Sequence, residues 1–408
     1  MRRLVPSVVP LVPVLLLAAC TDIQPTEPTG RRDVVPPPSA QGRLGDPLPG
    51  LTAEQLAAFA RGKVVFERQF TQAEGLGPTF NANSCVECHG EDDGVTGGTG
   101  DEVERHFTRL NADGSCGKLA NHGGFIKQER ATQLLRDSTD FTDEPFPSVT
   151  HQRGHRITPD LFGFGLIAAI PEDSLLVRHD PNDADGDGIS GRAHFVGGVV
   201  GRFGRKASAT DLDGFNTGAF LFEMGITTEL FPDENSVGRW VIGGDSIPAS
   251  VDPVTVRELG NNDLADLNAF VRFLAPPPDT TVFYVDESPA GLFRSIGCAK
   301  CHTPEFTTAP SAIAALSEKK VRPFSDFLLH DMGPELADIC LVNAAPSEFR
   351  TEPLMGARFM TRFMHHGQAS TISQAISMHG GEAASSRDEF NGLTAAQRSA
   401  VIAYINTL

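Results

Sequence analysis

Cys85-Val-Glu-Cys88-His89 and Cys298-Ala-Lys-Cys301-His302 are the two stretches that decide the fold of this 408-residue sequence. Both have the spacing Cys-x-x-Cys-His. Two thiols at this spacing reach the two vinyl groups of a haem, and the next histidine lies under the iron as its proximal ligand. The sequence therefore predicts two covalently bound haem c groups, held by the four cysteines and ligated by His89 and His302.

Two other kinds of site also use paired cysteines. Four cysteines can form a zinc ribbon, and one Cys-x-x-Cys pair can be a thioredoxin-type redox centre. A zinc site leaves both adjacent histidines unexplained, and a redox pair needs neither a second copy nor a histidine. The export signal described below also favours haem c.

The segments that flank the two motifs follow one plan. A capping box at Thr52 opens a helix before the first motif, and an amphipathic helix over 263–274 follows the motif and stops at the prolines 276–278. Gly291-Leu-Phe293 leads into the second motif, and a helix that opens at Thr394 with another capping box ends the sequence. The alternative is a coincidence of common helix signals, but the paired motifs favour duplication.

The repeated plan predicts a mainly α fold of two cytochrome c-like domains, with long loop insertions in the first. Residues 51–275 form the first predicted domain and residues 279–408 the second, separated by the prolines. The region 91–200 is rich in Gly and Asp. We expect loops with short helices there, as an elaboration of the first domain.

The N-terminal segment predicts export and anchoring. Residues 1–19 contain two arginines and an apolar run that is broken by prolines and too short to span a bilayer, as in a signal peptide. Leu17-Ala-Ala-Cys20 resembles the bacterial lipobox, so Cys20 is the predicted lipid anchor and residues 20–50 its Pro- and Thr-rich tether. We therefore expect a lipoprotein at the periplasmic face of the bacterial envelope. A plain secretory signal is the alternative.

The remaining cysteines suggest a disulfide. Of the seven cysteines, one is the predicted lipid site and four belong to the haem motifs, which leaves Cys116 and Cys340. In an oxidising compartment two such cysteines are expected to pair, here across the two domains. Two separate buried thiols are the alternative.

The charge excludes one class of function and indicates a kind of partner. The sequence has 34 basic and 52 acidic side chains, a net charge of −18. Such a chain cannot neutralise phosphates as a general nucleic-acid binder must. A partner that docks by electrostatic attraction is expected to be basic.

Further segments carry a family resemblance. They are TPDLFGFGL (158–166), GRFGRKA (201–207), EMGIT (223–227), SDFLLHDMG (325–333), FRTEPLMG (349–356) and HGGE (379–382). With the paired motifs, they make residues 51–408 resemble the di-haem oxidoreductase family of peroxidase-like proteins. The sequence is more distantly similar to bacterial di-haem cytochrome c peroxidases and to the di-haem enzyme that matures methylamine dehydrogenase.

The resemblance implies a second axial ligand for the C-terminal haem. His365-His366-Gly367 resembles a segment of the peroxidases, which place a ligating Met fourteen residues beyond its histidine. Fourteen residues beyond His365 is His379, the predicted ligand opposite His302. A histidine that only caps the preceding helix is the alternative. His330 and His365 are expected to hydrogen-bond near the haem rather than to bind iron.

The resemblance also implies an acid over the N-terminal haem. Glu223-Met-Gly resembles the peroxidases' Glu-Met pair, whose acid stands over an open iron. Cleavage of peroxide takes a proton from the inner oxygen and returns one to the outer oxygen, and a carboxyl group with a raised pKa can do both. Glu223 is therefore the predicted catalytic residue, with a structural Glu as the alternative. Asp213 departs from the pattern of the di-haem peroxidases, which carry a distal Gln at this position.

Electron transfer between the haems is expected to differ from that in the relatives. They carry a Trp near the segment that matches 202–207, where this sequence offers Phe203 and Arg205 and has its one Trp at Trp240. Phe is far harder to oxidise than Trp, so we expect direct tunnelling. His106 stands near the position where some peroxidases have a removable distal histidine.

Asp183, Asp185 and Asp187 repeat the spacing of the first three ligands of an EF-hand loop and predict a structural calcium site. The twelfth position is His194 rather than the usual Glu. A solvated Asp-rich turn is the alternative.

Together these features predict a di-haem c-type oxidoreductase that reduces peroxide or uses peroxide to oxidise a partner protein. Electrons are expected to enter through the C-terminal haem, from a small basic c-type cytochrome or a cupredoxin. The alternative is a pure electron-transfer cytochrome that has no substrate site.

Overall fold

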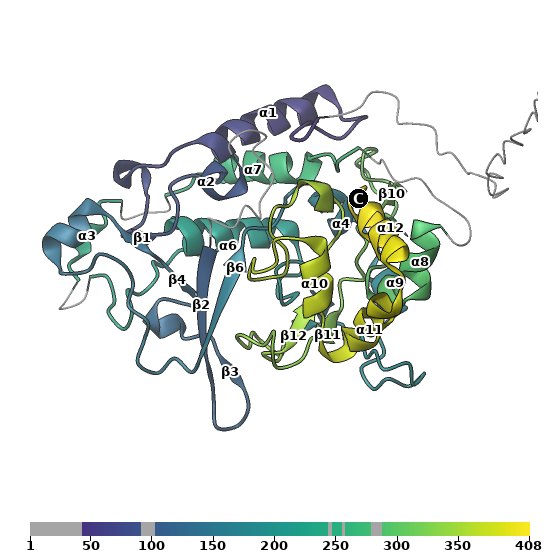
Figure 1. Cartoon of the computed structure of the whole chain (residues 1–408). Helices are drawn as coiled ribbons and strands as arrows, with labels where there is room; N and C mark the ends of the chain where they lie inside the picture. The colour runs from purple at the N-terminus through teal and green to yellow at the C-terminus, as the bar shows by residue number, and fades with distance from the viewer. Residues whose placement is uncertain (1–42, 91–102, 244–246, 255–257, 279–287) are drawn as a thin grey trace, which may run out of the picture.

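Two pairs of packed helices frame the Cys-x-x-Cys-His segments (Figure 1). α1 (Ala53–Glu67) packs against α7 (Asn261–Phe273), and α8 (Pro289–Ser295) packs against α12 (Ala395–Ile405). The capping boxes predicted at Thr52 and Thr394 are both confirmed, each closed by a Gln three residues later. Helix, motif and closing helix thus occur in the same order in both halves.

The computed structural model describes residues 43–90, 103–243, 247–254, 258–278 and 288–408. The predicted signal peptide, Cys20, most of the tether and residue 279 lie outside these ranges. Within them, no helix is both long and apolar enough to cross a membrane.

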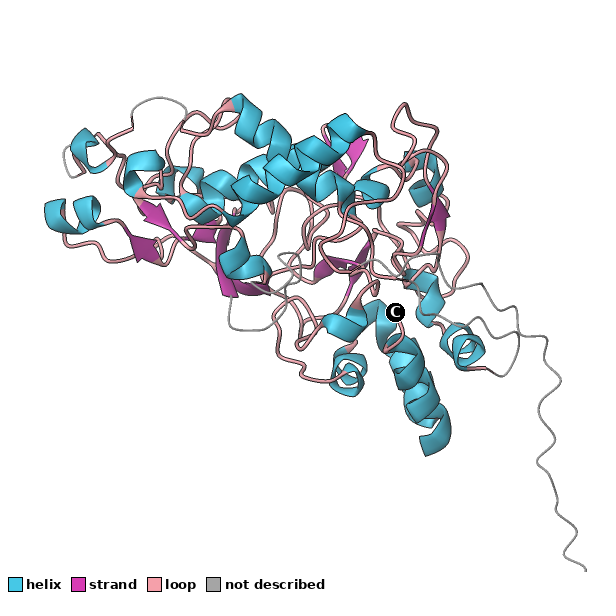
Figure 2. Ribbon diagram, turned by 90° about the horizontal axis from the view of Figure 1, so that it is seen from above, coloured by secondary structure: helices cyan, strands magenta, loops and turns pink. Residues whose placement is uncertain are grey.

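The other α-helices of the described residues are four to thirteen residues long. They are α2 (Val86–His89), α3 (Gln133–Ser138), α4 (Phe164–Ala168), α5 (Glu172–Leu176), α6 (Leu212–Met224), α9 (Cys298–Cys301), α10 (Ile372–Met378) and α11 (Ala384–Gly392). The strands are β1 (Thr79–Phe80), β2 (Val103–Leu110), β3 (Cys116–Gly117), β4 (Ile126–Lys127), β5 (Arg130–Ala131), β6 (Gln152–Ile157), β7 (Phe195–Val196), β8 (Val199–Val200), β9 (Phe306–Thr307), β10 (Lys320–Val321), β11 (Leu329–Asp331) and β12 (Glu348–Arg350). Figure 2 shows these strands as short pieces among helices and loops.

A four-stranded antiparallel sheet corrects the expectation of loops and short helices over 91–200. In the described part of that region, β2 pairs with β6 from Val103↔Ile157 to Thr108↔Gln152, and β3 and β4 also pair with β2. The strand was not recognised because polar and apolar residues do not alternate along it: His106, Phe107 and Thr108 are all buried. The fold therefore combines helices with small sheets, which the description "mainly α" does not capture.

The two halves share one core and one covalent link. The largest buried cluster joins side chains of α1 and α7 to Phe327, Leu328 and Met355 of the C-terminal half. The predicted disulfide between Cys116 and Cys340 is confirmed, with Cα atoms 5.8 Å apart. It ties β3 to the C-terminal half, so the four-stranded sheet cannot move freely relative to that half.

Gly62 allows the close crossing of α1 and α7. A Cβ atom added at Gly62 would lie 1.9 Å from the backbone oxygen of Asp266. Phe59 and Phe66 flank this glycine on α1, and each ring centroid lies 5.0 Å from that of Phe270. The missing side chain therefore lets these aromatic rings meet.

Gly62→Ala should lower the free energy of unfolding by about 1–3 kcal/mol, because overpacking forces the helices apart. Gly392→Ala is the matched control, since it is also a helical glycine but nothing lies within 4 Å of its added Cβ. We expect the control to change stability by less than about 1 kcal/mol. Denaturant unfolding measures both, and equal effects would contradict the crossing argument.

Candidate functional site

Each Cys-x-x-Cys-His motif opens onto its own cavity. Cys85, Cys88 and His89 line an N-terminal cavity of about 450 Å³. The second motif lines a C-terminal cavity of about 190 Å³. Apolar side chains dominate both walls, among them Phe66 in the first cavity and Phe293 in the second. Both cavities can therefore hold a flat apolar group next to the thiols.

The motif histidines are held in the same way. The Nδ1 atom of His89 lies 3.1 Å from the backbone oxygen of Pro159, and that of His302 lies 2.9 Å from the oxygen of Phe324. An Nδ1–H donated to a carbonyl orients the ring and leaves Nε2 as the metal-binding nitrogen. Burial lowers the pKa of His302 to about 4, so that its ring is neutral, as a metal ligand must be.

His379 lines the same C-terminal cavity as His302. Its Nδ1 atom bonds the oxygen of Ala375 at 2.7 Å, and the two imidazole centroids are 6.5 Å apart. An imidazole nitrogen lies about 2 Å from a bound transition metal and the ring centroid roughly 1.2 Å further, so two rings on one iron would have centroids about 6.4 Å apart. The cap and ligand interpretations are compatible, because His379 caps α10 through Nδ1 and has Nε2 left for iron.

Glu223 lies at the end of α6 and lines the N-terminal cavity. The Asn81 amide donates a hydrogen bond to its Oε2 atom at 2.8 Å, and its side chain also bonds that of Glu104. Burial, together with the negative charge of Glu104, raises the pKa of Glu223 well above its ordinary value. Both effects favour the protonated form of Glu223.

Glu104, which sequence reasoning missed, lines the same cavity as Glu223 and His106. The Nε2 atom of His106 lies 2.6 Å from Oε2 of Glu104. Burial opposes the ionisation of Glu104, but hydrogen bonds from His106 and Glu223 hold its pKa below the ordinary value. Glu104 and His106 share one face of β2 because side chains two residues apart in a strand point the same way. Had β2 been recognised as a strand, the position of Glu104 two residues before His106 would have pointed to it.

Comparison with known proteins identifies the family. Residues 147–408, well over half of the sequence, match the family described as "Di-haem oxidoreductase, putative peroxidase". This protein belongs to the di-haem oxidoreductase family. Membership of a di-haem family implies two haem groups, which agrees in number with the two cavities.

Two solved structures are similar to this di-haem oxidoreductase. A Kuenenia stuttgartiensis hydrazine synthase, pressurised with xenon, shares 15% identity over 95% of this chain and 99% of that chain, with a TM-score of 0.40. A MauG-like protein associated with microbial copper homeostasis shares 14% identity over 94% of each chain, with a TM-score of 0.36. No curated protein matches the sequence.

In this di-haem oxidoreductase, Asp213 does not take the position of a distal side chain. It forms an ion pair with Arg272, about half of its side chain is exposed, and it is not among the residues that line the N-terminal cavity. Asn216, three residues further along α6, lines the cavity and donates a hydrogen bond to Asn268 at 3.0 Å. The helical turn thus places Asn216, rather than Asp213, on the cavity side.

Arg205 and Arg350 line both cavities. Both bond the carboxylate of Glu352, with nitrogen–oxygen distances of 2.6 and 2.7 Å. Phe203 lines the N-terminal cavity, whereas Trp240 packs against a separate small core that contains Val237. Two arginines and a carboxylate, with no indole, therefore stand between the cavities.

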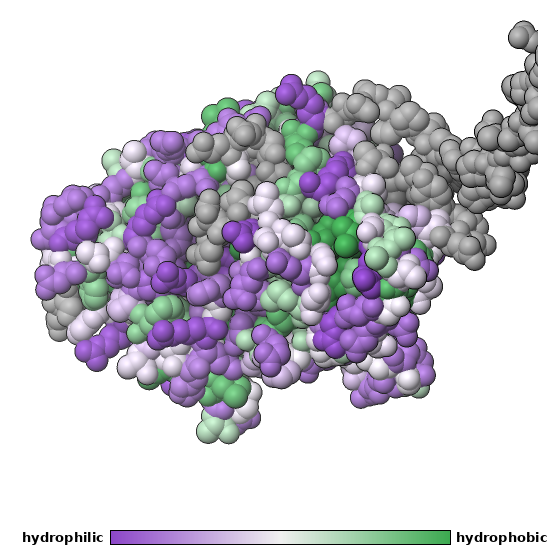
Figure 3. Space-filling view, viewed as in Figure 1, coloured by the Kyte–Doolittle hydropathy of each residue, from purple (hydrophilic) through white to green (hydrophobic). Residues whose placement is uncertain are grey.

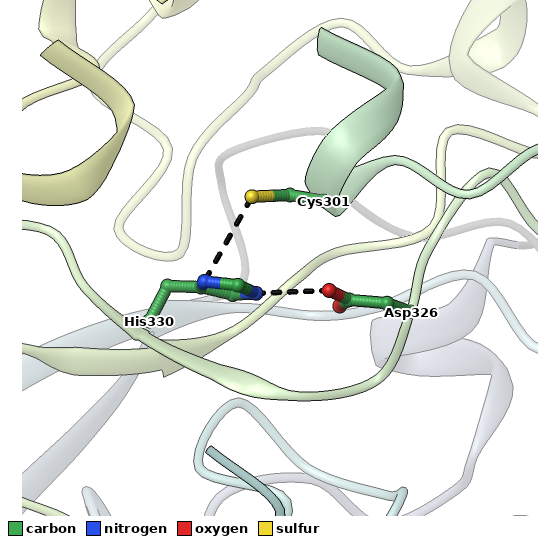
Figure 4. Close-up of side chains that lie close together, drawn as sticks. All are labelled: Cys301, Asp326 and His330. Atoms are coloured by element: carbon green, nitrogen blue, oxygen red, sulfur yellow. Dashed lines mark hydrogen bonds and ion pairs between the residues drawn. The ribbon is translucent and has the colours of Figure 1, made fainter. Parts of the chain in front are cut away.

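His330 lies beside the thiol of Cys301 (Figure 4). Its ring bonds Asp326 at 2.9 Å and Glu382 at 2.8 Å, and its Nδ1 atom lies 3.8 Å from the sulfur. Burial lowers the pKa of His330, but the hydrogen bonds outweigh burial and raise it well above the ordinary value. His365 lines the C-terminal cavity and stacks on Phe349 with centroids 4.0 Å apart.

The Asp-rich loop differs from the EF-hand expectation. Carboxylates of Asp180, Asp183 and Asp185 approach one another within 4.8 Å, whereas Asp187 pairs with Lys300 at 3.0 Å. His194 is fully buried, and its Nδ1 atom lies 2.6 Å from the oxygen of Lys206, so it does not act as the twelfth ligand. The acidic group on this loop therefore begins at Asp180.

Proposed function

We propose that this di-haem oxidoreductase reduces peroxide at its N-terminal cavity, with electrons that enter through the C-terminal haem. One observation carries the proposal: the two cavities are unlike. The smaller one has an imidazole, His379, at ligand distance from the motif histidine, whereas the larger one has an acid, Glu223. An iron that only relays electrons can have both axial positions filled by protein ligands, whereas an iron that reacts with peroxide needs one position free.

The residues of each cavity fit a covalent haem c. Cys85 and Cys88 would attach the first haem and Cys298 and Cys301 the second, in domains over 51–275 and 279–408. When bound, the haem irons supply one-electron redox chemistry and the coordination position that peroxide occupies. His89 and His302 would be the proximal ligands and His379 the second ligand of the C-terminal iron.

Glu223 would supply the protons. Reduction of peroxide to two water molecules consumes two electrons and two protons, and cleavage of the O–O bond is fast only if the departing oxygen is protonated. A buried, protonated carboxyl group can make that donation. With a haem bound, the mostly apolar walls would limit the water around Glu223, which would strengthen its hydrogen bond to the departing oxygen.

Electrons would pass between the haems by tunnelling through the region of Arg205 and Arg350. Two guanidinium groups on one carboxylate leave a net positive charge between the cavities, where it can stabilise the carboxylates of bound haem. The donor would be a small basic c-type cytochrome or a cupredoxin. Hydrophilic side chains cover most of the face in Figure 3, and the net charge of −18 would steer such a donor toward the protein.

Two further expectations complete the proposal. The protein would be exported by residues 1–19 and anchored through a lipid on Cys20 at the periplasmic face of the envelope. The Asp180, Asp183 and Asp185 carboxylates would hold a structural calcium ion, with Asp187 excluded by its pairing to Lys300.

One observation favours a second candidate, a pure electron carrier. His106 lines the N-terminal cavity, and its Nδ1 atom is buried without a hydrogen bond. If that nitrogen bound iron, both haems would be six-coordinate and no position would remain for peroxide.

Mass and spectra of the purified protein test the proposal against this second candidate. The denatured protein should retain two haems, and the ferric spectrum should contain a high-spin component. The half-reduced protein should turn over peroxide. A mass with fewer than two haems would remove the basis of the proposal, and purely low-spin spectra without turnover would favour the carrier.

His379→Met should keep the C-terminal haem low-spin and raise its potential, because thioether stabilises ferrous iron more than imidazole does. A sulfur-to-iron charge-transfer band should appear in the ferric spectrum. His366→Met is the control, because His366 is also in the C-terminal half and partly buried but does not line the cavity. An unchanged potential and spectrum in the His379 variant would place His379 off the iron.

Glu223→Gln should slow peroxide reduction by about 10²–10⁴-fold, or ~3–5 kcal/mol of barrier, because the amide cannot release a proton. Haem content and both redox potentials should stay nearly unchanged. Stopped-flow kinetics with peroxide measures the rate. Reduced stability with full turnover per folded molecule would show a structural Glu instead.

Calcium removal should lower the melting temperature. A bound ion at a hundredfold excess over its Kd stabilises the fold by about 2.7 kcal/mol, which a chelator would abolish. Asp185→Asn should remove the response to the chelator, whereas Asp388→Asn, an exposed acid on α11, should leave it intact. If the chelator does not change the melting temperature of the wild-type protein, the calcium site is absent.

A further inference from the structure

Two carboxyl groups, not one, reach into the N-terminal cavity. Glu223 comes from α6 and Glu104 from β2, and their side chains are hydrogen-bonded to each other. Two ionised carboxylates in contact would repel strongly away from water, so one of them carries a proton. The cavity therefore holds an acid and a base side by side.

The neighbouring side chains decide which of the two carboxyl groups is ionised and which is protonated. The amide of Asn81 donates a hydrogen bond to Glu223 at 2.8 Å, and this one neutral donor offsets only part of the rise in the pKa of Glu223 that burial and the charge of Glu104 cause. The ring of His106 bonds Glu104 at 2.6 Å, and Arg156 is the cross-strand partner of Glu104 in the β2–β6 register. A ring N–H and a nearby guanidinium both favour the ionised form. Glu104 is thus the base and Glu223 the acid.

His106 can act as this donor in one tautomer. Its Nδ1 atom is buried and has no hydrogen-bond partner, whereas Nε2 meets Glu104. A proton on Nδ1 would be an unsatisfied buried donor, so the single proton of the neutral ring belongs on Nε2. Burial lowers the pKa of His106, in keeping with a neutral ring.

The other charged groups around Glu223, Glu104 and His106 are engaged elsewhere. Arg156 forms an ion pair with Asp338, and the Nζ atom of Lys206 bonds three backbone oxygens, the nearest at 2.7 Å. Lys118 lies over the ring of Phe125. These cations therefore act on Glu104, Glu223 and His106 through their charge.

We propose that Glu104 is a second catalytic residue, the base that takes the proton of bound peroxide while Glu223 protonates the departing oxygen, and that His106 is its positioning residue. This inference rests on the proposed function. The O–H bond of the inner oxygen breaks as an O–H bond forms on Glu104. The O–O bond breaks as Glu223 gives its proton to the outer oxygen, which leaves as water; the two electrons come from the haem centres.

The hydrogen bond between Glu104 and Glu223 lets the two groups return to their starting protonation states. After cleavage Glu104 carries the proton and Glu223 is ionised. The proton returns from Glu104 to Glu223 through the bond that joins them, with no net proton consumed by the cleavage step. The two protons of the overall reduction are taken up when the remaining oxygen leaves as the second water.

The pH profile of peroxide cleavage tests this division of roles. The wild-type rate should fall at low pH, where the pair binds an extra proton and loses its base, and at high pH, where it loses its acid. Glu104→Gln should slow cleavage by about 10²–10⁴-fold and abolish the low-pH limb. His106→Gln should keep most of the activity and move the low-pH limb upward, because Glu104 loses a donor that favours its ionised form.

An infrared measurement gives a readout that does not depend on turnover. The carboxylic acid band of Glu223 should be present at neutral pH and absent from Glu223→Gln. In Glu104→Gln it should titrate at lower pH, since the neighbouring negative charge is gone. Glu144→Gln is the matched control: Glu144 is buried and accepts a hydrogen bond from the backbone N–H of Gln128 but does not line the cavity. Burial raises the pKa of Glu144 to about 8, so this variant should lose an acid band of its own and leave the Glu223 band, the rate and the pH profile unchanged.

The possible failures can be told apart. A wild-type protein without peroxide reactivity overturns the proposed function and, with it, the roles of the pair. Normal wild-type activity with an unaltered rate and pH profile in Glu104→Gln overturns only the inference. A change of haem spin state in His106→Gln would make His106 an iron ligand. If Glu104→Gln does not fold, Glu104→Ala should regain activity with added formate, and a failure of this rescue counts against the base.

Discussion

An imidazole that binds iron must present one ring nitrogen to the metal and have the other one held by the protein. His89 and His302 satisfy this requirement with backbone carbonyls of Pro159 and Phe324, which lie 70 and 22 residues away in the sequence. Long segments must therefore fold back to each motif before either histidine is oriented. Much of the loop structure serves this purpose.

The aromatic rings of the first helix in each half meet the same histidines. Phe66 of α1 lies 6.0 Å from the ring of His89, and Phe293 of α8 lies 6.4 Å from that of His302. Because these helices are anchored by α7 and α12, helix packing and ligand orientation support each other. The repeated plan thus has a physical reason beyond the motif itself.

Local signals predicted the parts of the fold that depend on neighbours in sequence. The capping boxes at Thr52 and Thr394 need residues three apart, and the disulfide followed from counting cysteines. β2 was missed because buried side chains lie on both of its faces, polar His106 and Thr108 on one and Phe107 on the other, so no alternation marks it. Glu104 was missed because it lies on this unrecognised strand, and Glu223, which lines the same cavity, is 119 residues away in the sequence.

The acid pair is also tied to the half of the molecule that it does not belong to. Arg156 faces Glu104 across β2 and β6 and pairs with Asp338, next to the disulfide-bonded Cys340. The positive charge that favours ionised Glu104 is therefore oriented by the C-terminal half. A displacement of that half would alter the electrostatic field at the acid pair as well as the distance between the cavities. Under the proposed function, proton chemistry in one cavity and electron supply from the other would therefore depend on the same interface.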